Sequence, residues 1–397
     1  MSAQGSLAEY AMQHDWSSFF DAFGITALVL GLFWLGLRSK SLSRFFPAQP
    51  ERISSIDGLR GFLALAVLFS HLLSFRTYLR TGEWTFPGHF FEFAPVTAVQ
   101  LFFCITGFLF WSKAIRRKGR LDVKEFYVRR FLRIFPLYVA VVAATAATLM
   151  AHGRGALSAA DFESAAQLLY PRTASGDWPT IRGQTPFFYL AQCWTLAFEV
   201  CFYAIFPVLA WIFARSLKSF VAFLPVALAI LLIGLRVSRL EDLAQCAPFL
   251  VGMISAEVVE RKVALSFLRG IGGTVLVVAG LAVLYMHHSK FSDVMLLLCF
   301  VPIAAGNTLF GLLAWKPCRA LGDISYSVYL IHLLAIHWLV FAWPYSVAGA
   351  SVRGFWLFGT LSVLATVLCS LVTYRLFEEP FMRSRGSFSQ VKPALAA

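Results

Sequence analysis

Four ionisable side chains fall inside long apolar stretches of the sequence, where charge is costly and each polar group needs a partner. They are His71, Glu199, His332 and His337. A neutral imidazole can take a proton from a hydroxyl group and release it later, which is the work of a general base. The same side chain can instead only hydrogen-bond a neighbouring helix. For His71 the sequence leaves both interpretations open.

His71 is the candidate base because of its distance from Arg60. Ten residues, all apolar or small, separate the two, so they lie about 16 Å apart along a helix axis. Arg60 marks the cytoplasmic edge, which puts the imidazole near mid-membrane. Glu199 lies about 10 Å inside the opposite edge, at a similar depth. Its carboxylate can orient the imidazole and stabilise the protonated form. The alternative is a structural pair with an arginine or tyrosine.

Nine Lys and Arg residues crowd into residues 112–133. Membrane orientation and attraction to anionic lipid account for the first five. Arg129, Arg130 and Arg133 differ, because they stand together where the next apolar stretch enters the membrane. Arg130 and Arg133 are three residues apart and share one helix face, and paired guanidinium groups form a fork for phosphate. These arginines predict a site for a phosphate-bearing cytoplasmic donor.

Another group of polar side chains opens the apolar stretch 324–343. Ser325, Tyr326, Tyr329 and His332 lie close together there, and Tyr329 and His332 occupy adjoining positions of one helix face. Their polar tips need partners in lipid. Either they line the same cavity as His71 or they hold neighbouring helices together.

The elements that must position these residues are membrane-spanning helices. Of the 397 residues 59% are hydrophobic and only 14% are charged, against about 25% in soluble domains. The apolar residues come in long blocks rather than in alternation. The pattern predicts an all-α bundle of about eleven transmembrane helices: 22–37, 59–75, 93–111, 134–151, 192–214, 219–235, 243–259, 270–286, 293–314, 324–343 and 354–375.

The distribution of basic residues predicts the orientation of these spans. With the N-terminus outside, 25 of the 34 Lys and Arg residues fall in cytoplasmic segments, as the positive-inside rule requires. The C-terminus is then cytoplasmic. The formal net charge of +13 is therefore explained without nucleic acid. The seven cysteines show no metal-ligand spacing, so we expect no metal.

Three segments are predicted along the chain. Residues 1–50 form an outer N-terminus, an additional helix and a cytoplasmic linker; 51–382 form the main membrane domain; and 383–397 form a flexible cytoplasmic tail. The longest outer loop, 152–191, is rich in Gly and Pro. Two interpretations are open for this loop: a plain connector, or a lid that binds an acceptor substrate.

The sequence resembles the acyltransferase-3 family of integral membrane acyltransferases over about residues 53–382. Six pieces match in order, and it is their order that makes the resemblance specific. They are Asp57-Gly58-Leu59-Arg60 with His71 after ten residues; 102–109; Arg129-Arg130-Phe-Leu-Arg133-Ile-Phe-Pro136; Trp194-Thr195-Leu196 with Glu199 and Phe202-Tyr203; Ser325-Tyr326-Ser-Val-Tyr329-Leu-Ile-His332; and Glu379-Pro380.

This resemblance implies a cytoplasmic acyl-CoA as co-substrate, usually acetyl-CoA, and no permanently bound cofactor. The acceptor is a hydroxyl of a glycan or lipid-linked saccharide such as polysaccharide or lipopolysaccharide. It implies that Arg60 and His71 are essential, that Arg130 and Arg133 serve activity, and that Trp194 and Tyr203 belong to the cavity region. The sequence departs from the family in its additional helix at 22–37, and in Thr106 where the family often has Ser.

We therefore expect a membrane O-acyltransferase of the bacterial inner membrane, with the donor held by Arg60, Arg129, Arg130 and Arg133. His71 acts as general base and Glu199 holds it. Two alternatives remain. Intramembrane His and Glu also occur in proton-coupled secondary transporters of a sugar or lipid, and the basic loop could dock a partner on a non-catalytic membrane protein. The acyl chain, an acyl-enzyme step and the oligomeric state are left open.

Overall fold

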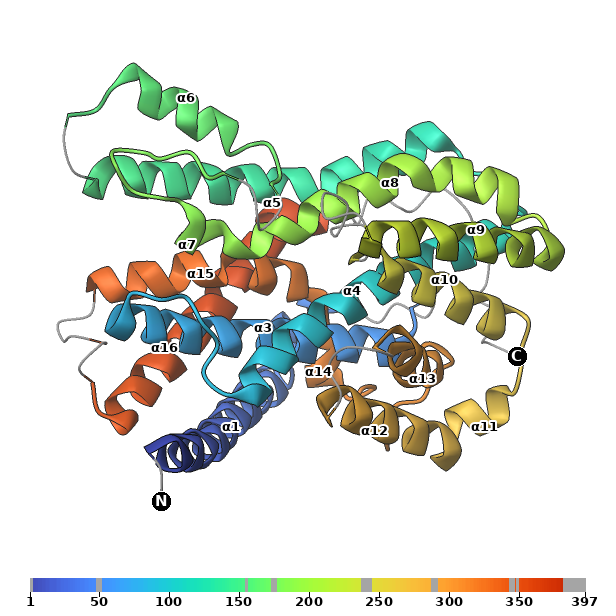
Figure 1. The fold of residues 1–397 in the computed structure, drawn as a ribbon, viewed down its shortest axis with the longest axis horizontal. Coiled ribbons are helices and arrows are strands. Elements are labelled where there is room, and N and C mark those ends of the chain that lie inside the picture. Colours follow the sequence, from blue (N-terminus) through green and yellow to red (C-terminus); the bar gives the residue numbers. More distant parts are fainter. Residues whose placement is uncertain are drawn as a thin grey trace.

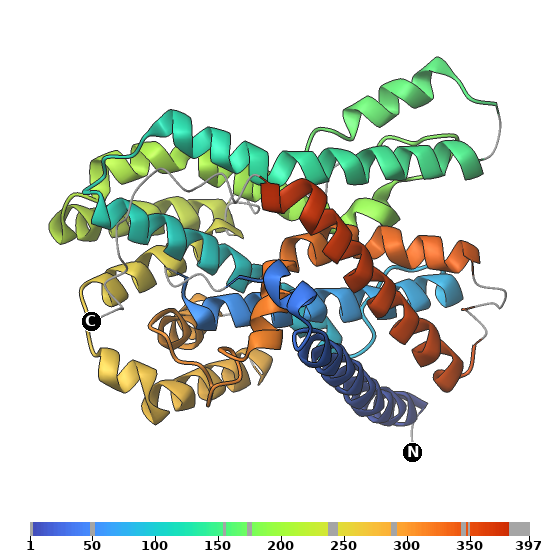
Figure 2. The same cartoon turned by 180° about the vertical axis from the view of Figure 1, so that it is seen from behind.

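The computed structural model describes residues 3–47, 52–153, 156–172, 177–236, 245–286, 292–342, 347 and 350–380. Within these residues the chain is helical and contains no β-strand. The predicted tail 383–397 lies outside them. α3, α5 and α15 run across the view of Figure 1, and in Figure 2 α16 crosses in front of α3 and α15, with α1 beside it. The predicted all-α membrane bundle is confirmed.

The first half of the described chain contains α1 (Ala3–Gly36), α2 (Lys40–Phe45), α3 (Ser54–Thr81), α4 (His89–Arg116), α5 (Val123–His152), α6 (Ala159–Gln167), α7 (Phe187–Leu190), a 3₁₀ turn (Ala191–Cys193) and α8 (Trp194–Phe213). The second half contains α9 (Leu217–Arg236), α10 (Ala247–Glu260), α11 (Leu265–Arg269), α12 (Ile271–Met286), α13 (Ser292–Ala304), α14 (Lys316–Asp323), α15 (Ser325–Ala342) and α16 (Val352–Thr373), which continues as a π turn (Tyr374–Glu378).

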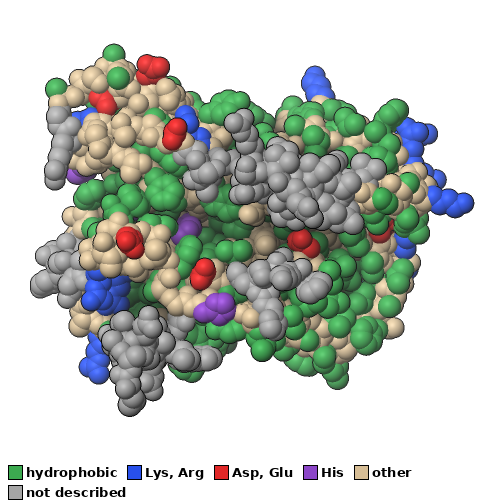
Figure 3. Space-filling model, in the orientation of Figure 1, with side chains coloured by type: hydrophobic (Ala, Val, Ile, Leu, Met, Phe, Trp, Pro, Cys, Tyr) green, Lys and Arg blue, Asp and Glu red, His purple; other side chains and the backbone are tan. Residues whose placement is uncertain are grey.

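Seven of the described helices are long and apolar enough to cross a membrane. They lie at Ser18–Gly36, Ser54–Thr81, His89–Arg116, Val123–His152, Phe187–Phe213, Ser325–Ala342 and Val352–Glu378. α12 and α13 are shorter apolar helices. Hydrophobic side chains cover much of the face seen in Figure 3, and Lys and Arg gather toward its two sides. Such a surface is typical of a protein whose helices are embedded in the lipid bilayer.

One predicted span has the wrong boundary. The stretch 293–314 was expected to form a single span, but α13 ends at Ala304. Gly306 and Gly311 have φ values of +106° and +91°, and a helix cannot continue through residues in that conformation. Hydropathy alone did not reveal this break.

Two glycines allow α4 and α10 to pack closely. A Cβ atom built on Gly107 would lie 2.2 Å from the carbonyl oxygen of Phe249, and one built on Gly252 would lie 2.1 Å from that of Cys104. Small residues at such positions let helix backbones approach closely in membranes. This contact holds α4, and with it the wall of the cavity described below.

We predict that Gly107→Ala destabilises the protein by about 1–3 kcal/mol, because the added methyl group overpacks a backbone contact. Thermal unfolding in detergent measures the effect. Gly24→Ala is the matched control, because a Cβ atom there meets nothing within 4 Å. An equal melting temperature for both variants would show that the contact between α4 and α10 is not tight.

The segment between α5 and α7 is tied down by Asp161. Its carboxylate accepts hydrogen bonds from the backbone N–H of Arg182 at 2.6 Å and from the N–H and Oγ of Ser158, both at 2.8 Å. The Arg182 guanidinium in turn donates to the carbonyl of Met150, near the end of α5. These bonds hold the pKa of Asp161 below its ordinary value. The described part of the predicted loop 152–191 is therefore an organised segment.

We predict that this segment loosens in acid. A carboxylate whose pKa is lowered by folding stabilises the fold above its ordinary pKa, and the stabilisation is lost as the pH falls through the lowered value. Asp161→Asn should show at pH 7 the faster amide exchange that the unchanged protein shows in acid, after correction for intrinsic exchange rates. Exchange mass spectrometry of residues 156–184 measures this, with the exposed Asp177→Asn as control.

Candidate functional site

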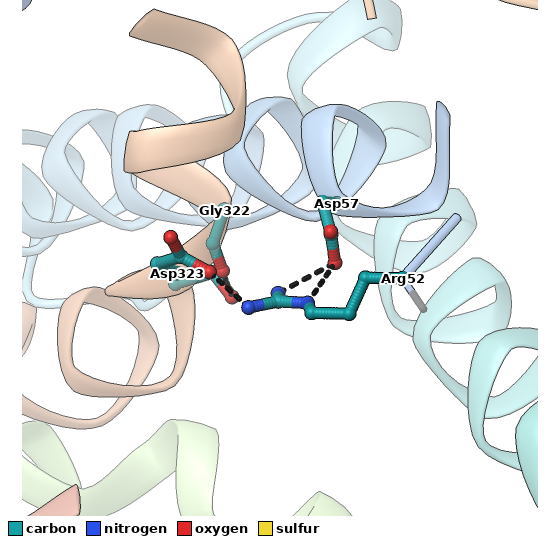
Figure 4. Close-up of polar contacts among 5 residues, drawn as sticks. Arg52, Asp57, Gly322 and Asp323 are labelled. Carbon is teal, nitrogen blue, oxygen red and sulfur yellow. Dashed lines mark hydrogen bonds and ion pairs between the residues drawn. The ribbon is translucent and has the colours of Figure 1, made fainter. Parts of the chain in front are cut away.

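An ion-pair clamp fixes the first turn of α3 against α14 (Figure 4). Arg52 donates to Asp57 Oδ1 from Nε at 3.1 Å and from Nη2 at 2.6 Å, and its Nη1 donates to Asp323. Burial opposes the charge on Arg52, but the two carboxylates raise its pKa above the ordinary value. Beside the clamp, a Cβ atom on Gly322 would lie 1.7 Å from the carbonyl oxygen of Asp57. The clamp thereby fixes Arg60, one turn further along α3.

His71 and His332 form a buried pair between α3 and α15. The Nδ1 atom of His71 lies 2.8 Å from Nε2 of His332. The two rings are nearly parallel, with an interplanar angle of 10° and centroids 5.1 Å apart. His332 is fully buried, and His71 keeps 9% of its surface exposed. Sequence reasoning found both residues but did not predict their pairing.

The hydrogen bonds of this pair fix which nitrogen carries each proton. The Nδ1 atom of His332 lies 2.7 Å from the carbonyl oxygen of Tyr329 and 3.2 Å from that of Val328. Carbonyl oxygens only accept, so His332 Nδ1 carries the proton, and in the neutral ring Nε2 accepts. His71 Nδ1 must therefore donate to it. The lone pair of His71 is left on Nε2, which is the position that a general base needs.

Glu199 does not contact His71, and this corrects the sequence-based prediction. Its Oε2 accepts a hydrogen bond from the hydroxyl of Tyr203 at 2.8 Å, and its Oε1 one from Thr106 Oγ1 at 3.4 Å. The pair with a tyrosine was the alternative interpretation of this residue. The depth of a side chain along a helix does not give its direction around the helix, and Glu199 points to Tyr203 of α8 and Thr106 of α4. A catalytic role of Glu199 stays a prediction.

A cavity is bounded by α3, α4, α5, α8 and α15. Its lining reaches Tyr329, one turn from His332, but includes neither His71 nor His332. Three of its wall residues are Arg60, Arg130 and Arg133. The polar remainder of the wall consists of Thr106, Thr195, Glu199, Tyr203, Ser325, Tyr326 and Tyr329, and the rest is apolar or aromatic, with Phe102, Phe103 and Phe110 among them. The structure thus gathers residues from five helices that the sequence singled out separately.

Arg130 and Arg133 lie on one face of α5, as their spacing predicts. The guanidinium of Arg130 also lies over the ring of Phe110, 4.8 Å from the ring centroid. Arg129, in contrast, does not line the cavity and forms an ion pair with Glu125 one turn away. A role of Arg129 in binding the donor therefore stays a prediction that the geometry does not favour.

The side chains of α15 have defined partners. Ser325 Oγ donates to the carbonyl of Gly322 at 2.7 Å, and the Tyr326 hydroxyl donates to that of Ile134 at 2.8 Å. The Tyr329 hydroxyl donates to the carbonyl of Gln192 at 2.9 Å. Ser325, Tyr326 and Tyr329 line the arginine-containing cavity, whereas His332 and His71 do not. Whether this group of residues shares a cavity with His71 therefore stays a prediction.

Tyr329 is the link between the cavity and the histidines. Its side chain lines the cavity, its hydroxyl lies 3.0 Å from Thr195 Oγ1, and its backbone carbonyl accepts from His332. The ring centroids of Tyr329 and His332 are 6.2 Å apart. Trp194, which was expected in the cavity, instead packs edge-on against Phe198 and does not line it.

Sequence reasoning missed Glu378. The carboxylate is buried and accepts a hydrogen bond from Ser327 Oγ at 2.5 Å, and it interacts electrostatically with Arg133 and Arg60. The π turn at the end of α16 carries it, and such turns occur frequently at functional sites. The available signal was an acidic residue directly before the Glu379-Pro380 motif. In the described part of the chain, no three His, Cys, Asp or Glu side chains are grouped as metal ligands.

Comparison with known proteins assigns the chain to a family. The model of an acyltransferase domain family, acyltransferase-3, matches residues 53–375. The chain is 24% identical to a protein of Bacillus subtilis named peptidoglycan O-acetyltransferase YrhL, over 85% of this chain and 56% of that protein. It is 23% identical to O-acetyltransferase OatA of Staphylococcus aureus, over 85% of this chain and 58% of that protein. It is 26% identical to nodulation protein 10 of Rhizobium leguminosarum, over 84% of this chain and 94% of that protein.

The chain spans a little over half the length of the first two of these relatives. No solved structure matches it. The family model covers most of the chain, including Arg60, His71, the α5 arginines, Glu199 and His332. This chain belongs to the acyltransferase-3 family of acyltransferase domains and is an integral membrane protein.

Proposed function

We propose that this protein transfers an acetyl group from cytoplasmic acetyl-CoA to a hydroxyl group of an envelope glycan or lipid-linked saccharide. The names of the relatives support the acetyl group and a saccharide acceptor. The cavity supports the donor, because three arginines in a mostly apolar wall suit a phosphate-rich molecule with an apolar arm. The single observation that carries the proposal is the hydrogen-bond chain that leaves the His71 Nε2 lone pair available.

The orientation follows from the distribution of charge. The cluster of Lys and Arg around residues 112–133 belongs on the cytoplasmic side of a bacterial inner membrane. Arg130 and Arg133 then face the compartment that supplies acetyl-CoA, and the N-terminus lies outside. His71 lies about 16 Å deeper than Arg60 along α3. The donor enters from the cytoplasm and the acceptor from the opposite side.

In the proposed reaction, His71 accepts one proton from the acceptor hydroxyl and later donates it to the leaving group. His71 Nε2 takes the proton of the acceptor hydroxyl as its oxygen attacks the thioester carbonyl. The positive charge that forms on His71 is stabilised by the His332 Nε2 lone pair, which the hydrogen bond to Tyr329 keeps in place. The carbon–sulfur bond then breaks, and the leaving thiolate receives the proton from His71 Nε2. Acetyl ester and CoA are the products.

We predict that His71→Gln abolishes transfer from labelled acetyl-CoA and that His332→Leu lowers kcat about 10²–10⁴-fold, the usual contribution of a positioned base. His332→Gln should recover part of the loss, because an amide oxygen can replace Nε2 as the acceptor. A purely structural role for His332 predicts no difference between the Leu and Gln variants at equal thermal stability. Normal transfer by a folded His71→Gln protein would refute the mechanism.

We predict further that Arg133→Gln and Arg130→Gln each raise the KM for acetyl-CoA about tenfold or more, because a hydrogen bond to a charged group contributes about 1.5–3 kcal/mol. Initial rates at varied acetyl-CoA measure this. Lys124→Gln is the control: it removes the same charge from an exposed position of α5. Equal KM values for all three variants would exclude the cavity as the donor site.

The acyltransferase family favours group transfer over the proton-coupled transport that intramembrane His and Glu residues also suggested. Transport would require flux without consumption of acetyl-CoA. Release of CoA that depends on the acceptor distinguishes the two in one assay.

A further inference from the structure

Five aromatic side chains gather on the side of His71 that faces away from the arginine-lined cavity. We call them the aromatic cluster: Tyr78 of α3, Trp84 and Phe86 of the connection from α3 to α4, and Phe187 and Phe188 of α7. Ring centroids of Trp84 and Phe86 lie 5.9 and 6.1 Å from that of His71. All five side chains are half-buried, so each keeps part of its surface accessible.

The cluster is continuous. Trp84 lies 5.6 Å from Phe188, 6.2 Å from Phe187 and 6.4 Å from Tyr78, measured between ring centroids. Tyr78 and Phe188 are 4.1 Å apart. The connection from α3 to α4 and the short α7 lie on the same side of the bundle in Figure 1, beside the end of α15. Two segments far apart in the sequence, residues 78–86 and 187–188, therefore build one surface next to the histidine.

His71 is the point where this surface meets the proposed chemistry. The imidazole is nearly parallel both to the ring of His332, at an interplanar angle of 10°, and to that of Phe86, at 21°. Tyr78 comes seven residues after His71 on α3, about 10 Å toward the helix end, whereas Arg60 precedes it by about 16 Å. The cluster and the donor cavity thus approach His71 from opposite ends of one helix.

An aromatic belt at the membrane surface is the other explanation for such residues. Belt residues spread around the perimeter of a protein and face lipid. Trp211 fits that description, being 59% exposed on α8. The cluster instead stays half-buried, and two of its rings, Trp84 and Phe86, contact the buried imidazole of His71. Lipid contact does not explain why Trp84 joins the rings of Tyr78, Phe187 and Phe188 to this histidine.

Resting on the proposed function, we propose that the aromatic cluster binds the acceptor by stacking a pyranose ring against Trp84. One face of a pyranose carries C–H groups and its edge carries hydroxyls. The electron-rich face of an aromatic ring attracts the C–H face, while the hydroxyl edge stays free to approach His71. Mostly aromatic walls with a few polar groups are typical of sites for neutral ligands.

The test separates stacking from mere apolar contact at Trp84. Trp84→Phe keeps an aromatic face, and Trp84→Leu keeps apolar volume without one. Purified protein in detergent micelles receives labelled acetyl-CoA at saturating concentration and increasing amounts of delipidated envelope glycan from the cells that carry the gene. Base-labile label in the glycan is measured. Trp211→Leu serves as the control for loss of a belt tryptophan.

We expect Trp84→Leu to raise the half-saturating amount of glycan about tenfold, because the aromatic face that attracts the C–H groups is lost. Trp84→Phe should stay within about threefold of the unchanged protein, the KM for acetyl-CoA should be unaltered, and Trp211→Leu should match the unchanged protein. Phe188→Leu provides a second variant with the same expected direction, should Trp84→Leu melt early.

Three outcomes overturn the inference. Equal glycan requirements for Trp84→Leu and Trp84→Phe mean that the cluster offers only apolar contact, as it would to a lipid chain. A raised KM for acetyl-CoA assigns the cluster to the donor. Normal behaviour of both Trp84→Leu and Phe188→Leu leaves the cluster as a structural wall. Failure of the unchanged protein to label any glycan would instead refute the proposed function itself.

Discussion

The hydrogen bond between His71 and His332 is the interaction on which the site depends. Both rings are buried between α3 and α15, and an unpaired polar group in such surroundings costs several kcal/mol. Each ring therefore needs the other, and His332 also needs the carbonyl of Tyr329. The backbone carbonyls of α15 fix the proton on Nδ1 of His332. This in turn fixes the proton on Nδ1 of His71. The helical fold itself thus decides which nitrogen of His71 holds a lone pair, and no carboxylate is required.

The arginine-lined cavity contains more positive than negative charge. Among the described residues that line it, three arginines face the single carboxylate of Glu199, and Glu378 acts on Arg60 and Arg133 from behind the wall. Buried charges persist only when they are compensated. This excess of guanidinium groups over carboxylates suits the phosphate groups of the proposed donor. Asp57 and Asp323 are both paired directly with Arg52.

Much of this arrangement was predictable from local sequence patterns, and the rest was not. Hydropathy located the helices, and the spacing of Arg130 and Arg133 correctly put them on one face of α5. The contact between Glu199 and His71 was wrong because equal depth in two helices says nothing about rotation around their axes. The pairing of His71 with His332 joins residues 261 positions apart. Glu378 was missed because its burial results from α16 ending in a π turn, which no apolar period signals.

The order of Arg60, His71 and Tyr78 along α3 determines how the parts of the site are spaced. Arg60, His71 and Tyr78 project from one helix, at the cavity, at the histidine pair and in the aromatic cluster respectively. A rigid helix keeps these separations constant, so two substrates bound at its two ends meet at a fixed point. Such pre-organisation lowers a barrier by removing the entropy of orientation. It explains why both ends of α3 are secured, by the Arg52 clamp at one end and by ring contacts at the other.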